Sequence, residues 1–111
     1  MNKFGFQTDK SDISFESHLV NLGKDIEILL VNLRDFVLTL GDNVIEEVRP
    51  HRIVYAKSLT FRYFLDIYPR NNDLIIGIRK NRKESTKEYV VSNIQEIQSI
   101  EPEIKEAYKS V

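Results

Sequence analysis

The chain has 111 residues, of which 41% are hydrophobic and 30% charged, a composition typical of one globular domain with a single core. It contains no cysteine, which excludes disulfides, a thiolate nucleophile and thiolate metal ligands. No apolar run approaches the roughly 18 residues of a membrane span, and the N-terminus lacks the apolar stretch of a secretory signal. We therefore expect a cytoplasmic protein.

The net charge is only -1, but the charges are unevenly distributed along the chain. The segment 49–88 contains ten basic and four acidic residues, a net charge of +6, whereas the remainder contains six basic and thirteen acidic residues, a net charge of -7. A basic middle is typical of a surface for an anionic partner, or of a basic sheet that faces acidic helices of the same chain. We favour the internal pairing, because nucleic-acid domains usually have a pI above about 9.

Residues 1–12 are polar and show no sustained period, so we expect a flexible arm followed by a single domain at 13–111. Apolar residues at helical spacing then predict a helix from Gly23 to Leu40, which Gly41 ends in a left-handed turn. A second apolar stripe interrupts the polar side of this helix at Ile28, Val31 and Leu38. Either the N-terminal arm covers this stripe or a second protomer does, which would make the protein a homodimer.

Apolar runs and alternation predict four strands, and a short charged segment adds a fifth. The strands lie at 44–48, 52–57, 60–68, 74–79 and 87–91. The pair Asn71-Asn72 suits a two-residue hairpin turn, because asparagine tolerates positive φ. This turn sets a register in which Asp66 lies opposite Gly77 and Phe64 lies opposite Arg79.

The register divides the side chains of the hairpin between two faces. The predicted core face, which the helices should cover, holds Phe61, Tyr63, Leu65, Ile67, Leu74, Ile76 and Ile78, with Ile53 and Tyr55 from the preceding strand. The outer face is mixed and holds Arg62, Phe64, Asp66, Tyr68, Ile75, Gly77 and Arg79. There we expect a cation-π pair of Phe64 and Arg79 worth about 0.5 to 1 kcal/mol, and open space above Gly77 beside Asp66.

The last helix is predicted to begin at Ser92, which forms a capping box with Gln95. Pro102 interrupts its apolar stripe, so we expect a break or kink there and a second segment at 103–109. The order of elements predicts an α+β fold (α-β-β-β-β-α). In this fold an antiparallel sheet of four to five strands carries the long N-terminal helix and the C-terminal helix on one face.

The sequence lacks the usual signatures of catalysis. His18 and His51 lie in different predicted elements, and neither GxSxG nor a phosphate-binding glycine motif occurs. The strand that pairs with Asp66 has no acidic residue to complete a nuclease metal site, and the adjacent Glu46 and Glu47 point to opposite faces of their strand. We therefore predict a non-enzyme without catalytic residues, metal or cofactor.

The predicted interaction surface comprises the outer face and the residue that follows it: Arg62, Phe64, Asp66, Tyr68, Ile75, Arg79 and Lys80. Patches rich in aromatic side chains and arginine are typical of protein interfaces, so our leading hypothesis is a non-catalytic, self-associating interaction domain. The alternative is a nucleic-acid accessory module that uses the same basic and aromatic side chains. A small-ligand site beside Asp66 is a third hypothesis, and no membrane partner is expected.

Four segments resemble, in order, a bacterial and archaeal domain family of unknown function whose members are often labelled "predicted transport protein". They are SFESHLVNLGKDIEILLVNLRDFVLTLGDNVIEEV, RPHRIVYAK, YFLDIYPRNNDLIIGIRK and IKEAYKS. The resemblance spans about residues 14 to 109 and supports the fold more than the function. Members of the family usually carry a longer insertion with a Gly-His-Trp-Gly-like stretch after the hairpin, whereas this chain has only residues 80–87 there.

Overall fold

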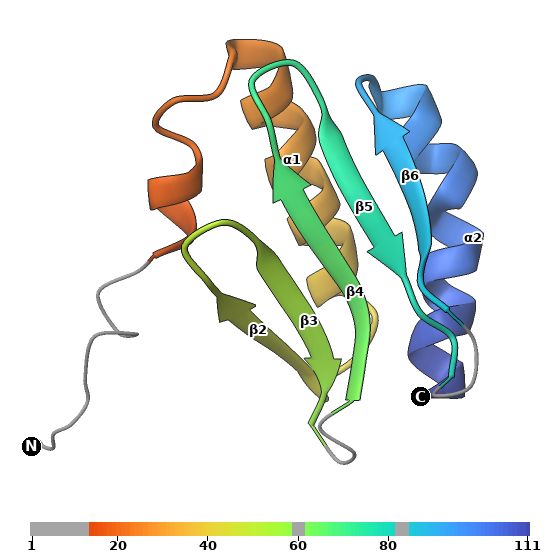
Figure 1. Ribbon diagram of the computed structural model, residues 1–111. Coiled ribbons are helices and arrows are strands. Elements are labelled where there is room, and N and C mark those ends of the chain that lie inside the picture. The colour runs from red at the N-terminus through yellow and green to blue at the C-terminus, as the bar shows by residue number, and fades with distance from the viewer. Residues whose placement is uncertain (1–13, 59–61, 82–84) are drawn as a thin grey trace, which may run out of the picture.

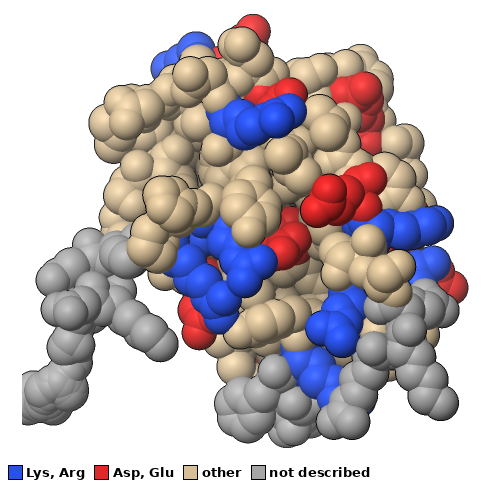
Figure 2. Space-filling model, in the orientation of Figure 1, with Lys and Arg blue, Asp and Glu red and all other residues tan. Residues whose placement is uncertain are grey.

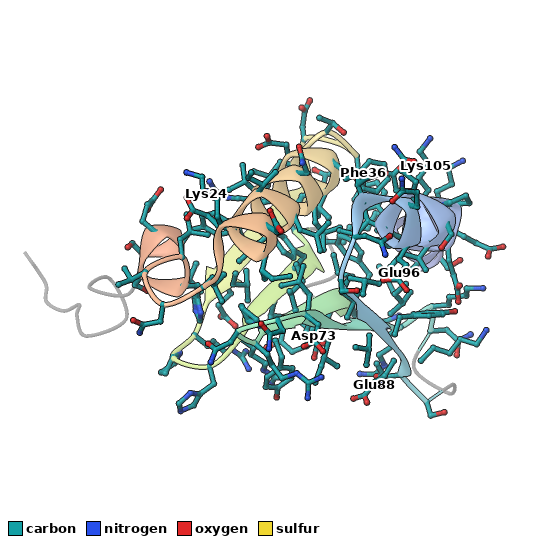
Figure 3. All side chains as sticks on the ribbon, turned by 90° about the horizontal axis from the view of Figure 1, so that it is seen from above. Lys24, Phe36, Asp73, Glu88, Glu96 and Lys105 are labelled. Atoms are coloured by element: carbon teal, nitrogen blue, oxygen red, sulfur yellow. The ribbon has the colours of Figure 1, made fainter. Side chains whose placement is uncertain are left out.

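The computed structural model describes residues 14–58, 62–81 and 85–111, so the predicted arm at 1–12 and Phe61 lie outside the described residues. Five antiparallel strands form one sheet in the order β2-β3-β4-β5-β6, and both long helices cover the same face of it (Figures 1 and 3). The elements are η2 (Phe15–His18), α1 (Lys24–Leu38), β2 (Val44–Val48), β3 (Ile53–Lys57), β4 (Arg62–Pro69), β5 (Leu74–Ile78), β6 (Lys87–Val91) and α2 (Ile94–Ser110). The predicted α+β fold is confirmed, and the fifth strand is present.

The core lies between the sheet and the two helices. Helix α1 buries the residues that the helical spacing predicted, and α2 buries its own apolar stripe: Ile26, Leu29, Leu30, Leu33 and Val37, then Ile97, Ile100, Ile104 and Ala107. These side chains pack against the buried residues of β3, β4 and β5. Burial of a large aliphatic side chain contributes roughly 1.5 to 3 kcal/mol, so these two stripes determine which face of the sheet the helices cover.

Helix α1 ends earlier than predicted, and Gly41 does not end it. The last helical residue is Leu38, and the hydroxyl of Thr39 donates to the carbonyl of Phe36 at 2.6 Å. The backbone of Gly41 is not left-handed; instead, a Cβ at this position would lie 2.2 Å from the hydroxyl oxygen of Tyr108. Glycine is therefore required here for the close approach of α2, which the local sequence does not reveal.

Helix α2 differs from the prediction at two points. Its N-cap is Asn93, one residue after the predicted Ser92, and the Asn93 side chain accepts from the Glu96 backbone N–H at 2.9 Å. The helix also continues through Pro102, so of the predicted break or kink the break is wrong, while the kink stays a prediction. An internal proline costs about 3 kcal/mol, but buried apolar residues on both sides of it hold the two halves against one continuous sheet.

The hairpin register is confirmed from Leu65 opposite Ile78 to Tyr68 opposite Ile75, and the pairing of strands β3 and β4 adds a β-bulge. Tyr55 pairs with Leu65 and Ala56 pairs with Tyr63, so Phe64 is the extra residue. Because a bulge inserts one residue, the side chains beyond it change faces.

The bulge corrects three predictions about the outer face. The side chain of Phe64 is fully buried and meets the ring of Tyr108 edge to face at 5.4 Å. The predicted cation-π pair of Phe64 with Arg79 is therefore wrong, although the backbone N–H of Arg79 does donate to the Phe64 carbonyl at 3.0 Å. Tyr63, predicted for the core, is 39% exposed instead.

Candidate binding site on the open face of the sheet

The face of the sheet opposite the helices carries a mixture of aromatic, charged and aliphatic side chains, and we call it the open face. Figure 3 shows Glu88 of β6 on this side, away from both helices. In Figure 2, which views the open face, basic and acidic side chains lie next to one another at its centre, and further basic side chains lie below them. The pairing of strands places Glu47, Val54, Asp66, Gly77 and Glu88 in one row across the five strands.

Two arginines lie over two tyrosines on this face. The guanidinium of Arg49 lies 5.3 Å from the centre of the Tyr63 ring and forms an ion pair with Glu47. The guanidinium of Arg52 lies 5.7 Å from the centre of the Tyr68 ring and forms an ion pair with Asp66 at 3.0 Å. Each stacked cation contributes about 0.5 to 1 kcal/mol at a partly exposed site, and each ring restricts the guanidinium above it.

A cavity of about 240 Å³ opens in the middle of this face. Its lining residues are Arg52, Tyr63, Leu65, Asp66, Gly77, Arg79 and Thr86. The position directly above Gly77 is occupied, since a Cβ there would lie 2.2 Å from a carboxylate oxygen of Asp66 and 2.9 Å from the methyl group of Thr86. The prediction of open space above Gly77 is therefore wrong: the Asp66 carboxylate and the Thr86 methyl group fill that position, and the cavity lies beside them.

The charge on Asp66 is incompletely compensated. Burial raises the pKa of this carboxyl above its ordinary value of 3.8, and nearby Glu88 acts in the same direction. Arg52 and a hydrogen bond with the Gly77 backbone oppose the shift without cancelling it. The carboxylate can therefore accept further stabilisation from a positively charged group or a hydrogen-bond donor.

Arg52 also has hydrogen-bonding capacity that the protein does not use. A guanidinium carries five N–H donors, and within the described part of the chain Arg52 donates only to Asp66, through Nη1. Its side chain is 31% exposed and lines the cavity. The cavity therefore presents unused guanidinium donors next to an under-compensated carboxylate.

The structure brings together four of the seven residues predicted for the interaction surface: Asp66, Tyr68, Ile75 and Arg79. Phe64 lies in the core. Arg62 lies opposite Lys57 in the strand register, and the Lys57 ammonium group donates to the Tyr108 carbonyl. Arg62 therefore belongs to the helix side of the sheet and not to the open face. Lys80 pairs with Glu106 of α2 at 2.9 Å. The sequence reasoning missed Arg49, Arg52, Tyr63 and Thr86, because the Asn71-Asn72 turn determines only the pairing of β4 with β5, whereas Arg52 reaches this face through the separate pairing of β3 with β4.

The predicted stripe on α1 is not a continuous exposed surface. Ile28 is 51% exposed and Leu38 is 40% exposed, but Val31 is partly buried against the core. Ile28 lines a shallow groove of about 230 Å³ together with Ile94 at the start of α2. The exposed residues at the two ends of α1 are therefore separate features.

Part of the basic middle segment pairs with acidic residues elsewhere in the chain. Lys87 lies 3.5 Å and Lys80 lies 4.0 Å from Glu103 of α2, and Arg49 pairs with Glu47 of β2. The hydroxyl of Tyr89 donates to Glu103 at 2.5 Å, and this hydrogen bond, followed by the two lysines, lowers the pKa of the Glu103 carboxyl despite its burial. Such contacts agree with the internal pairing that the charge distribution favoured.

Other features of the described residues do not add a second candidate site. No group of three or more His, Cys, Asp or Glu side chains in the described ranges is arranged to hold a metal ion, and none of the described helices is long and apolar enough to cross a membrane. His18 is hydrogen-bonded through Nε2 to the Arg49 carbonyl at 2.7 Å, and Glu46 and Glu47 do point to opposite faces. No protein-family model, curated protein or solved structure matches the chain.

Proposed function

We propose that the protein is a non-catalytic interaction domain that self-associates through strand β6 at the edge of the sheet. The observation that carries this proposal is a row of three apolar side chains on the open face, which runs from Tyr68 through Ile75 to Val90 and ends at that edge. Val90 is 57% exposed, the largest exposure of any large hydrophobic residue in the described strands. An edge strand presents unpaired backbone N–H and C=O groups to a further strand.

The chemistry of β6 favours a second copy of the same strand as the partner. If two β6 strands pair antiparallel about Val90, each Val90 lies opposite the partner's Val90, and Tyr89 lies opposite the partner's Val91. On the open face the apolar row then continues across both copies through six side chains. Such an interface is isologous, so every favourable contact occurs twice, and apolar cross-strand pairs contribute roughly 0.2 to 1 kcal/mol each.

The opposite edge strand, β2, is less suited to this role. It carries two charges of the same sign, Glu46 and Glu47, which would repel those of a second copy, whereas the two charged residues of β6, Lys87 and Glu88, have opposite signs. All five of its residues are only partly exposed. Glu46 is also fixed within the fold, because it accepts from Arg34 Nε at 2.8 Å and from the hydroxyl of Tyr55 at 2.8 Å.

The test is the mass of the protein in solution, measured by size-exclusion chromatography with light scattering over a concentration series. We expect a mass twice the 13.0 kDa of one chain. Val90→Lys places two ammonium groups face to face at the twofold axis and should give a monomer. Val20→Lys is the matched control, because Val20 is 75% exposed outside the sheet, and it should leave the dimer intact. A wild-type chain that remains monomeric at the highest concentration would overturn the proposal.

A nucleic-acid module has less support from the open face. Single-strand platforms combine aromatic rings with a continuous cationic track. Here Glu47, Asp66 and Glu88 cross the middle of the same surface, and Arg49 and Arg52 are engaged by two of them. A phosphate backbone would meet these carboxylates at the centre of its path.

A further inference from the structure

We propose that the cavity beside Asp66 binds a small zwitterion of the α-amino acid class. The cavity is formed by the fold and is not a gap between loose surface side chains. The missing side chain of Gly77 lets the Asp66 carboxylate and the Thr86 methyl group lie over its backbone, and these two groups form two walls of the cavity. Its volume of about 240 Å³ is below the 300 to 1,000 Å³ typical of drug-sized ligands, which limits the occupant to a small molecule.

The positive part of the site is Arg52. This side chain is positioned on two sides, by the Tyr68 ring at 5.7 Å and by Asp66 at 3.0 Å. Its remaining donors have no acceptor among the described residues. The planar fork of a guanidinium matches a carboxylate, with which it forms two parallel charge-assisted hydrogen bonds. Because the arginine is already held in place, little side-chain freedom is lost when a carboxylate binds.

The negative part of the site is Asp66, with Glu88 near it. These two residues flank Gly77 in adjacent strands, and the Thr86 methyl group lies beside the Asp66 carboxylate above Gly77. Both carry a negative charge when ionised, so an ammonium group in the cavity next to Asp66 is stabilised by each. A ligand that has only a carboxylate would be repelled by these two residues, and a ligand that has only an amine would meet Arg52 and Arg79.

The spacing of the two charges selects the ligand class. The guanidinium Nη1 and the Asp66 carboxylate oxygen are only 3.0 Å apart, so the two oppositely charged groups of the ligand must also lie close together. In an α-amino acid a single carbon joins the ammonium and carboxylate groups, which gives this separation. Tyr63 and the Thr86 methyl group then provide an apolar wall for a small side chain.

Isothermal titration of the full chain with L-alanine, propionate and ethylamine tests the proposal, since the last two ligands carry one charge each. We expect L-alanine to bind at least about tenfold more tightly than either, because it alone forms charge-assisted bonds at both ends. Equal binding of the three compounds, or no heat from L-alanine at millimolar concentration, would overturn the proposal.

Two variants identify the cavity as the site. Arg52→Gln should weaken L-alanine by about tenfold or more, whereas Arg49→Gln, the matched arginine over Tyr63 outside the cavity, should bind like the wild type. Asp66→Asn should weaken L-alanine but strengthen propionate, because it removes the repulsion of an anion; this opposite response is not expected from general unfolding. Equal losses in the two arginine variants would contradict the assignment. Val90→Lys should bind normally, so this result is separable from self-association.

Discussion

Single residues of this protein act through partners far away in the sequence. Gly41 has an ordinary backbone conformation, yet its missing Cβ admits the Tyr108 hydroxyl from the other end of the chain. Phe64 is turned into the core by a bulge and packs on the same tyrosine. Lys57 lies over that ring at 4.8 Å. Tyr108 is therefore the point at which α2 is joined to the end of α1 and to strands β3 and β4.

Substitution of Gly41 tests this packing. Gly41→Ala introduces a Cβ at 2.2 Å from the Tyr108 hydroxyl oxygen and should lower the free energy of unfolding by about 1 to 3 kcal/mol. The double variant Gly41→Ala/Tyr108→Phe should recover part of that loss, because the nearest remaining ring atom, Cζ, lies at 3.0 Å. Urea unfolding of both variants and of Tyr108→Phe alone measures the coupling. Strict additivity of the two single changes would show that no such contact exists.

At the scale of elements, a polar cluster fastens α2 to the edge of the sheet. Glu103 accepts from Tyr89 of β6 and lies near Lys87 of β6 and Lys80 after β5. One oxygen of Glu103 is buried and has no hydrogen-bond partner among the described residues, so the carboxylate relies on these charges. Helix α2 is thus positioned by its apolar stripe and fixed in rotation by Glu103.

The pH dependence of stability follows from the lowered pKa of Glu103. Since the pKa in the folded state lies below the ordinary value of 4.5, ionised Glu103 stabilises the fold above that pH, and the contribution is lost as pH falls through the folded-state pKa. We expect Glu103→Gln to cost about 1 kcal/mol at neutral pH and progressively less below about pH 4. Denaturant unfolding at several pH values measures the difference. The control is Glu106→Gln, since Glu106 is 64% exposed; a cost for Glu103→Gln that grows in acid would contradict the assignment.

Pro102 offers a second test of α2. The proline lacks the N–H that would bond to the carbonyl four residues earlier, yet the helix continues through it. Pro102→Ala restores that donor, and we expect it to raise the free energy of unfolding by about 1 to 3 kcal/mol. The melting temperature and the urea midpoint of the variant measure the gain. A destabilised variant would mean that contacts of the proline ring outweigh its cost to the helix.

At the scale of the whole molecule, the two helices cover one face of the sheet and leave the other to polar and aromatic side chains. In this one-sided arrangement the side chains that form the core lie on the helix side of the sheet, and the side chains available for recognition lie on the open face. The open face then contains two distinct features: the cavity beside Asp66, and the apolar row that reaches the β6 edge. Self-association through the edge would leave the cavity accessible, because none of the described residues that line it belongs to β6, and Glu88 of β6 points to the open face and not along the edge.

Much of this architecture could be predicted from local patterns. Asn71-Asn72 determined the register of its hairpin, since a two-residue turn allows only one pairing of the flanking strands. The apolar spacing of α1 identified its buried side, because burial follows the helical period. Each of these features depends on residues close together in the chain. The family resemblance, which rests on the same structural segments, stays a prediction.

Only the tertiary structure decided which residues meet on the open face. The bulge at Phe64 is favoured because it allows the Phe64 ring to be buried against Tyr108. The periodicity of the local sequence cannot predict such a contact, because the partner lies more than forty residues away. The same bulge exchanged Phe64 for Tyr63 at the cavity, while the pairing of β3 with β4 brought Arg52 to Asp66. A strand's side-chain period determines two faces, but the burial energy of distant neighbours selects which side chain occupies each.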